Sequence, residues 1–501
     1  MNLSELRIIF TIFGLWVWLS SCSLIEGTDK IIGPEWSPEV ALPLVNTHIS
    51  VQDALDLSDT GDWLEISAAG DLTLIYDAGL ATLTREDLQI ITIPDIPVVM
   101  TDSQMTIPFP IEQLRRVVLK TGTLVVDYQS GLTGEYEVNL RMDYFRKGGI
   151  AFSAFFPLPP SGIGTTTFDL AGYALDMENG AISFSCYAHN KNDGLNYPLD
   201  QVNLLLKELD YSYVEGTIPA NSFESEPDSI KNDIFEQIAL KGFSLTDPSI
   251  TFRFDNSFGV PIEITSLAWA RGSDGITTIP LGHDGLAGGV NLGYPSLSEV
   301  GAYSTTDIIL DRTNSNITDI ISALPEVLTY QFGIITNPSG NAPSGFITDS
   351  SSLSVGISAR VPLEGKLEDL VMENTFEADL SDLDIVASGG FKLITENALP
   401  VEVLAQIYFL DSQGVVIDSL FEVATSLLPS PSVGINGAVV APGSQTLSVI
   451  FSEERFAALS STREVRIRAE ISTAGGGQVP VKFQLSDSID LKLGVIARIK
   501  I

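Results

Sequence analysis

Two thiols and three imidazoles are the groups with which this chain could perform nucleophilic or metal chemistry. His48, His189 and His283 lie far apart, and none has a second ligand at HxH or HExxH spacing. Cys186 belongs to the alternating run 182–188, on the same face as its apolar residues, so we expect a buried, inert thiol. We expect His189, at the end of that run, to be solvated, and His283 to lie in a flexible glycine-rich connection. The sequence therefore predicts no catalytic residue and no metal ligand.

Other catalytic signatures are absent from the sequence or cannot be located in it. It holds no GxSxG elbow, SxxK pair, P-loop or GxGxxG cradle, so we expect no cofactor. A glycosidase needs two carboxyl groups beside one sugar bond, and 64 acidic residues leave every pairing open. Residues 311–319 and 190–193 offer oxygen ligands without the spacing of an EF-hand, and we interpret them as a helix start and a turn.

The second thiol, Cys22, follows Leu19-Ser20-Ser21 and an apolar run over residues 8–19. This pattern resembles the lipobox of bacterial lipoproteins, which are cleaved before the cysteine and acylated on it. The resemblance implies a signal peptide over residues 1–21 and lipidation at Cys22. The apolar run is too short to cross about 30 Å of hydrocarbon as a helix. By the sorting rules of such lipoproteins, Ser23 favours the outer membrane, and the leaflet that the protein faces stays open.

The composition describes an acidic chain that is large enough for several hydrophobic cores. Of 501 residues, 44% are hydrophobic, and 27 Lys and Arg oppose 64 Asp and Glu, which gives a formal net charge of −37. Cleavage after residue 21 leaves 501 − 21 = 480 residues, enough for about three domains. The electrostatic field of such a negative chain repels nucleic acid and anionic lipid headgroups, so we expect no nucleic-acid partner. If Cys22 is acylated, Cys186 has no partner for a disulfide.

Period-2 alternation dominates the chain and predicts an all-β fold with minor short helices. The predicted strands cover residues 72–76, 123–128, 136–142, 182–188, 250–254, 353–361 and 489–499. Turns are expected at residues 77–79, 131, 274–275 and 411–414. Helices are expected at residues 51–57, at residues 229–240 and after Ser452, which is a plausible cap.

An internal repeat is the strongest structural signal. Residues 349–360 and 487–498 are 487 − 349 = 138 positions apart, and six of their twelve residues are identical. At the same offset Glu326-Val327 matches Glu464-Val465, and residues 254–264 match 395–403 with a small gap. We therefore predict two copies of one unit of about 138 residues.

The predicted domains follow from this repeat. They are a signal peptide (1–21), a lipid-anchored tether (22–60), an N-terminal β-rich domain (61–225) and repeat copies at 226–363 and 364–501. Tandem β-sandwiches fit their size and strand spacing. A curved sheet wrapped on the helix 229–240 is the alternative, and whether 61–225 holds a third copy stays open.

The layout resembles uncharacterised outer-membrane lipoproteins of the Bacteroidota, through residues 36–45, residues 169–173 and the turns that run from asparagine to proline. A looser likeness, through Asp247-Pro248 and residues 256–261, is to late-embryogenesis-abundant-like β-sandwich repeats. The resemblance implies no reaction.

The sequence thus favours a non-catalytic, lipid-anchored protein of the outer membrane whose tandem β-domains bind or scaffold. Its expected partners are the membrane and an unknown envelope protein, glycan or lipid. One alternative is a carrier of lipid or another apolar ligand, which needs an elongated cavity. A second is a carboxylate-based glycan-active enzyme.

Overall fold

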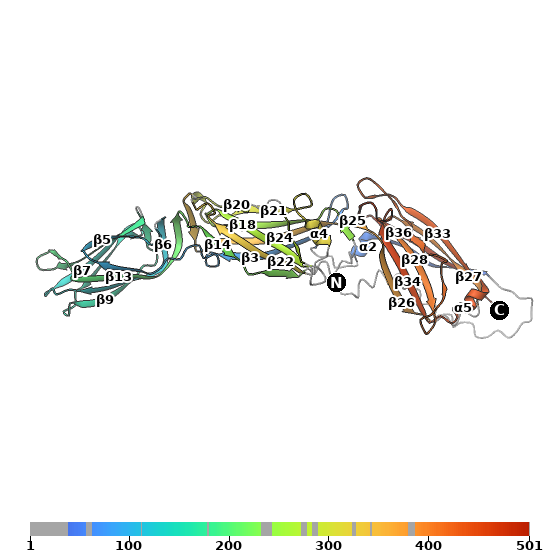
Figure 1. The fold of residues 1–501 in the computed structure, drawn as a ribbon, viewed down its shortest axis with the longest axis horizontal. Helices are drawn as coiled ribbons and strands as arrows, with labels where there is room; N and C mark the ends of the chain where they lie inside the picture. Colours follow the sequence, from blue (N-terminus) through green and yellow to red (C-terminus); the bar gives the residue numbers. More distant parts are fainter. Residues whose placement is uncertain are drawn as a thin grey trace, which may run out of the picture.

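The all-β prediction is confirmed by the computed structural model, in which short helices are few. The structure describes residues 39–56, 63–111, 113–177, 180–231, 243–271, 278–282, 289–322, 327–340, 343–378 and 386–499. Three β bodies follow one another along an elongated molecule (Figure 1). We call them the distal body (residues 96–216), the middle body (64–84 and 221–362) and the proximal body (39–56 and 370–499).

The distal body pairs eight main strands into two layers. One layer has the order β4 (Ile96–Met100), β13 (Gln201–Gly216), β6 (Leu114–Gln129), β9 (Ile163–Asp169). The other has the order β5 (Gln104–Pro108), β11 (Ala181–Asn190), β7 (Tyr136–Lys147), β8 (Ile150–Pro157). The short strand β10 (Ala174–Asp176) pairs with both β6 and β7 and so joins the two layers at one side. The short strand β12 (Asn196–Tyr197) pairs with the end of β11.

The middle body repeats this arrangement. Its first sheet has the order β3 (Leu72–Thr84), β24 (Ser352–Pro362), β17 (Ser249–Asn256), β21 (Ser304–Leu310), with β2 (Leu64–Ile66) beside β3. In its second sheet β14 (Asn221–Glu224) and β15 (Asp228–Lys231) pair one after the other along the same edge of β22 (Val327–Thr336). There β18 (Ile262–Arg271) pairs with β22 and carries β19 (Thr278–Pro280) and β20 (Val290–Leu292). Two short helices, η3 (Leu297–Glu299) and α4 (Ile317–Ser322), complete this body.

The proximal body has the same two sheets. The first has the order β1 (Glu39–Ser50), β36 (Ser488–Ile499), β27 (Val386–Asn397), β33 (Gly443–Phe451). The second runs from β26 (Leu370–Glu377) through β34 (Glu464–Thr473) to β28 (Val401–Leu410), which carries β29 (Val416–Ser419) and β30 (Thr425–Leu428). Helix α2 (Val51–Asp56) follows β1, α5 (Glu453–Leu459) follows β33, and β31 (Ser432–Val433) pairs with β32 (Val439–Ala441).

We letter the eight main strands of each body a to h in chain order. They are β4, β5, β6, β7, β8, β9, β11 and β13 in the distal body, β3, β14, β17, β18, β19, β21, β22 and β24 in the middle body, and β1, β26, β27, β28, β29, β33, β34 and β36 in the proximal body. All three bodies then have the sheets a-h-c-f and b-g-d-e. The middle and distal bodies both lie between strands a (β1) and b (β26) of the proximal body. The distal body likewise lies between strands a (β3) and b (β14) of the middle body. The chain is therefore nested: the first and last described strands, β1 and β36, both belong to the proximal body, and the distal body is the innermost insertion.

This nesting corrects the domain boundaries predicted from sequence. Residues 39–50, assigned to a tether, pair with β36 from Glu39 opposite Arg498 to Ser50 opposite Ser488. Residues 72–84, assigned to the N-terminal domain, pair with β24 in the middle body. Each repeat copy is thus completed by a strand from far upstream, because a sheet can take its edge strand from any part of the chain. The strand order of the distal body also matches that of a third copy.

One local prediction fails, and a second is tested only in its first three residues. The expected turn 77–79 lies inside β3, where the register shifts between Gly79 opposite Gly356 and Ala81 opposite Val355. This is a β-bulge, and β1 has the same shift opposite Gly494, the repeat equivalent of Gly356. The expected helix 229–240 begins in strand β15, and its residues 232–240 lie outside the described residues, so the helix-wrapped alternative gains no support.

Short sheets cross both joints of the molecule. Between the middle and proximal bodies, β25 (Glu364–Leu367) pairs with β16 (Phe243–Leu245) and with β35 (Val481–Lys482). Between the middle and distal bodies, β23 (Gly345–Thr348) pairs with the last four residues of β13. Because backbone ladders hold both joints, we expect the three bodies to move as one stiff rod.

Two aspartates at equivalent repeat positions lie near these joints in opposite electrostatic settings. Asp349 forms an ion pair with Lys120 at 2.9 Å, and this lowers its pKa. Asp487 is only 4% exposed, and burial raises its pKa to about 6, although the backbone N–H of Gln484 donates to its Oδ2 at 2.8 Å. The two carboxyl groups should therefore respond to pH in opposite directions.

We expect Asp487→Asn to stabilise the protein at pH 7.5 and to change little at pH 4. The folded-state pKa of Asp487 lies above the unfolded value near 3.8, so the folded protein holds the extra proton between about pH 4 and pH 6. The stability that this proton gives is complete below pH 4 and is lost as the pH rises through 6. Melting temperatures of variant and wild type at both pH values measure the effect. Asp349→Asn is the matched control, because it should destabilise at pH 7.5; equal responses of the two variants would contradict the account.

Candidate functional site

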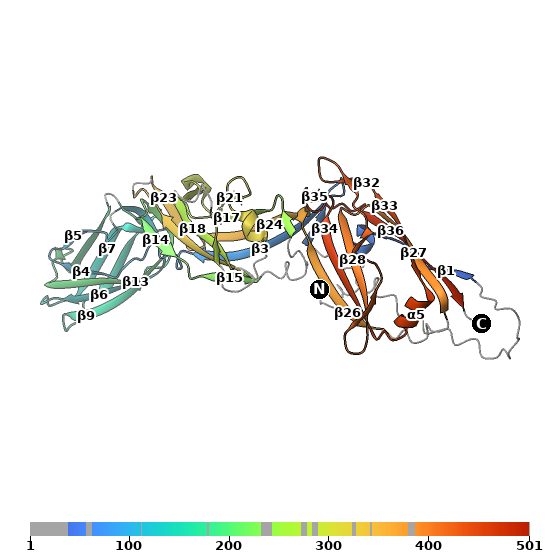
Figure 2. The same ribbon diagram turned by 45° about the vertical axis from the view of Figure 1, so that its right-hand side comes forward.

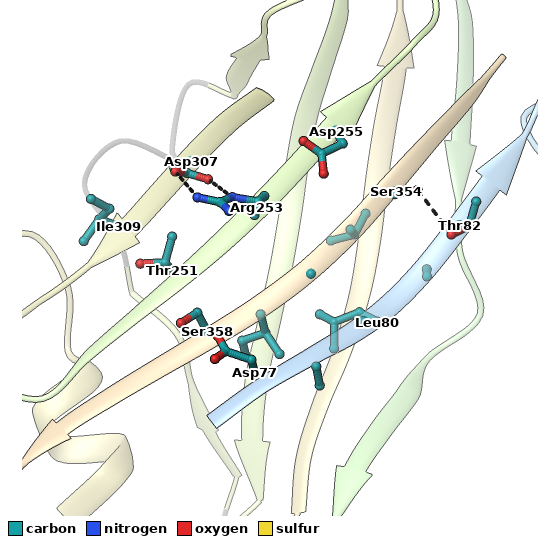
Figure 3. A pocket seen from close by; sticks show the side chains of 16 residues that line it. Asp77, Leu80, Thr82, Thr251, Arg253, Asp255, Asp307, Ile309, Ser354 and Ser358 are labelled. Atoms are coloured by element: carbon teal, nitrogen blue, oxygen red, sulfur yellow. Dashed lines mark hydrogen bonds and ion pairs between the residues drawn. The ribbon is translucent and has the colours of Figure 1, made fainter. Parts of the chain in front are cut away.

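A hollow of about 890 Å³ lies on the outer face of the first sheet of the middle body (Figure 3). We call it the trough. It is shallow and open because small residues occupy the outward positions of β24 and the bulge of β3 bends the sheet. Its floor is formed by Gly79, Thr82, Thr251, Ser354, Gly356 and Ser358.

Charged side chains line one side of the trough. Arg253 donates from Nε and Nη2 to the two carboxylate oxygens of Asp307 at 2.9 and 3.0 Å. These hydrogen bonds lower the pKa of Asp307 and raise that of Arg253, which Asp255 and Asp77 raise further. Asp255 also accepts a hydrogen bond from Thr305 Oγ1 at 2.5 Å. Three carboxylates around one guanidinium leave the trough negative, so it favours ligands that donate hydrogen bonds or carry positive charge.

The equivalent face of the proximal body has different chemistry. Gly494 opposes Lys392 there, whereas Gly356 opposes Arg253 in the trough. Ile394 occupies the position of Asp255. The shared bulge therefore preserves the backbone of this face, while its acidic side chains belong to the middle body.

The structure separates the residues that could have performed chemistry. Cys186 is buried at 1% exposure, as expected, and burial raises its pKa to about 12, so its thiol is not ionised at neutral pH. His189 lies near the end of β11 and its Nδ1 is 2.8 Å from Oδ1 of Asn196. His48, on β1, has its Nδ1 3.0 Å from Oδ1 of Asp490. His283 and Cys22 lie outside the described residues.

The two segments with oxygen ligands form local hydrogen bonds. Asp311 accepts from the backbone and hydroxyl of Thr313 at 2.7 and 2.5 Å, a few residues before α4 begins. Asp193 accepts from the backbone N–H of Leu195 and from the Tyr197 hydroxyl. Within the described ranges no cluster of three His, Cys, Asp or Glu is arranged to hold a metal ion.

Sequence reasoning missed the trough. A signal was present, because Ser352, Ser354, Gly356 and Ser358 alternate with buried Leu353, Val355 and Ile357 along one strand. A row of small outward residues indicates a sheet face that leaves room for something else. The partners on β3 could not be found in this way, because they are more than 250 positions away.

Comparison with known proteins gives no functional assignment. No family model matches the chain, and no curated protein does. Among solved structures, one similar chain is a protein of Parabacteroides distasonis ATCC 8503, for which secretion is inferred. This organism is a member of the Bacteroidota. The two chains have 9% sequence identity and a TM-score of 0.28, and the match covers 91% of this chain and 99% of that one. The VP2 subviral particle of infectious bursal disease virus has 10% identity and a TM-score of 0.17, over 78% and 74%. At these TM-scores neither likeness carries an argument about function.

Proposed function

We propose that this protein is a non-catalytic lipoprotein of the bacterial outer membrane, anchored through Cys22, that presents binding surfaces on a stiff rod. The observation that carries the proposal is the nested path of the chain. Strand β1, the first described element, pairs with the final strand β36 in the proximal body. The distal body lies at the opposite end of the molecule (Figure 2). An anchor attached ahead of β1 would therefore hold the proximal body and leave the distal body free.

The length of the linking segment supports this geometry. Glu39 follows Cys22 by 39 − 22 = 17 positions, which can span at most about 60 Å when fully extended. Among the described residues no helix is long and apolar enough to cross a bilayer. Membrane attachment in this proposal thus depends on acylation, in which each buried CH₂ contributes about 0.8 kcal/mol.

The carboxylates of the trough favour binding over hydrolysis. A glycosidase needs one carboxylic acid with a raised pKa to protonate the leaving group. In the trough the pKa of Asp307 is lowered by Arg253. Within the described part of the chain, Asp487 is the carboxyl group with a clearly raised pKa, and it lies buried near a joint. The pKa directions of these carboxyl groups therefore do not support the glycan-active alternative.

The lipid-carrier alternative also lacks a supporting observation. It requires an elongated apolar cavity between the sheets. The inward side chains of the distal and middle bodies instead form one packed cluster that includes Phe145, Phe252, Phe254 and Phe332, each at most 1% exposed. Packed aromatic side chains leave no room for an acyl chain at these positions.

The anchor is tested by metabolic labelling with palmitate. We expect the wild type to incorporate label and to fractionate with membranes, and Cys22→Ala to lose both properties. Cys186→Ala is the matched control, because the chain has two cysteines and this one is buried. Unlabelled wild-type protein, or equal loss of label in the control, would overturn the proposal.

A further inference from the structure

A row of outward side chains with two aromatic rings crosses the second sheet of the distal body; Phe155 is exposed, and Asn139 and Tyr187 are half-buried. Phe155 on β8 lies opposite Asn139 on β7, which lies opposite Tyr187 on β11. Their neighbours along the strands, Leu140 and Phe156, are buried at 0% and 8%, so the row belongs to the outer face. Phe155 is 60% exposed, so most of its ring faces solvent.

The row is spaced and held by the sheet. Phe155 and Tyr187 stand on strands separated by one strand, so their backbones are about 9–10 Å apart. Asn139, between them, donates from Nδ2 to the Tyr187 hydroxyl at 2.9 Å. This hydrogen bond fixes the ring of Tyr187 before any ligand arrives, which reduces the entropy lost on binding.

Polar side chains flank the aromatic row on both sides. On one side Glu137 lies opposite His189, whose ring nitrogen contacts Asn196 at 2.8 Å. On the other side Arg141 lies opposite Ser185, which lies opposite Gln104 on β5. We call this face the aromatic platform; it consists of Gln104, Glu137, Asn139, Arg141, Phe155, Ser185, Tyr187, His189 and Asn196.

The equivalent strand of the proximal body, β34, presents charged rather than aromatic side chains, namely Arg466, Arg468 and Glu470. Arg468 and Glu470 are paired at 3.2 Å, and Arg466 lies 3.7 Å from Glu373. On this face the neighbouring strand β28 carries one ring, Tyr408, opposite Arg466. The aromatic platform is therefore a feature of the distal body and does not follow from the common strand order.

We propose that the aromatic platform binds a neutral polysaccharide that lies across the strands. A sugar ring has an apolar C–H face, which packs on an aromatic ring, and a rim of hydroxyl groups that donate and accept hydrogen bonds. Two aromatic rings flanked by amide, carboxylate, imidazole and guanidinium groups match both parts. The chain's charge of −37 repels polyanions but does not oppose a neutral glycan. This inference deepens the proposed function by naming the ligand class of the body farthest from the anchor.

The test is affinity electrophoresis of the full chain in gels that contain β-glucan, xylan, mannan or starch. We expect at least one polysaccharide to retard the wild type. Phe155→Ala and Tyr187→Ala should each weaken the affinity about tenfold, which corresponds to about 1.4 kcal/mol for each lost aromatic contact. Tyr303→Ala is the matched control: Tyr303 is 69% exposed but lies in the middle body, so its loss should leave the retardation unchanged.

The outcomes separate this inference from the proposed function. No retardation by any of the four polysaccharides, or equal weakening by Tyr303→Ala, overturns the platform even if Cys22 is acylated. Retardation that depends on Phe155 and Tyr187, together with shortening of the polysaccharide during incubation, supports the platform and overturns the non-catalytic function. Capture of a protein through these residues without retardation also overturns the glycan assignment.

Discussion

A chain that begins at residue 226 will not fold into two sandwiches, although it contains both predicted repeat copies. It lacks β3 and β1, so β24 and β36 each lose the neighbour with which they form an eleven-residue register. The exposed edges are unpaired backbone that promotes aggregation. The middle sandwich also loses the apolar residues that its missing strand buries, such as Leu72 and Leu74 of β3. Far-UV circular dichroism and sedimentation of residues 226–501 should show little cooperative structure and large assemblies.

Complementation provides the control for this prediction. A separate chain of residues 39–91 carries both missing strands, and its co-expression should recover at least part of the soluble fragment. A fragment 226–501 that is monomeric and melts cooperatively on its own would contradict the nested path and restore consecutive domains.

Replacement of Asn397 by Ala should destabilise the proximal body by about 3 kcal/mol or more, since each orphaned buried backbone group costs about 1–3 kcal/mol. Asn397 is fully buried at the end of β27. It donates to the carbonyl groups of Val401 and Pro429 at 2.7 and 2.8 Å and accepts from the N–H of Leu399 at 3.0 Å. Alanine leaves all three groups without partners. Hydrogen exchange of β27 and β36 measures the loss of local stability.

The middle body offers a parallel test, because it also has a buried asparagine that bonds backbone groups at a strand end. Asn256 is fully buried at the end of β17, where it donates to the carbonyl of Gly293 and accepts from the N–H of Phe258, both at 2.9 Å. Asn256→Ala should therefore raise exchange in β17 and β24 and spare the proximal body. Asn314→Ala is the control, because this half-buried turn residue also donates to one carbonyl, that of Ile309 at 2.9 Å, and accepts from one backbone N–H, that of Asp311 at 3.0 Å. Equal effects of the fully buried and the half-buried substitutions would contradict the role of burial.

The sequence was a good guide to single strands and to the repeat. Each predicted strand lies within an observed one, since alternation along a few residues depends only on which face is buried. The six identities between residues 349–360 and 487–498 fall on β24 and β36 or just before them, and they include the glycines opposite both bulges. The buried setting of Cys186 followed from the same alternation.

The nested path could not be predicted, for a physical reason. Periodicity shows that residues 39–50 suit a strand, but it does not identify a partner more than 400 positions away. The aromatic platform was missed likewise, because Phe155, Asn139 and Tyr187 come from three strands whose register is fixed only in the folded sheet. Sites built across strands remain hidden until the pairing is known.

The pairing of β1 with β36 is tested most directly by a disulfide between Asn46→Cys and Lys492→Cys, in a chain with Cys22→Ser and Cys186→Ala. Asn46 and Lys492 are register partners and both are exposed, so their Cα atoms should be about 4.5–5.5 Å apart, within the range of a disulfide. Mass spectrometry of the unreduced digest should find the crosslinked peptide. Asn46→Cys with Lys392→Cys, one strand further on β27, should give no crosslink. A crosslink in both pairs, or in neither, would contradict the nested architecture.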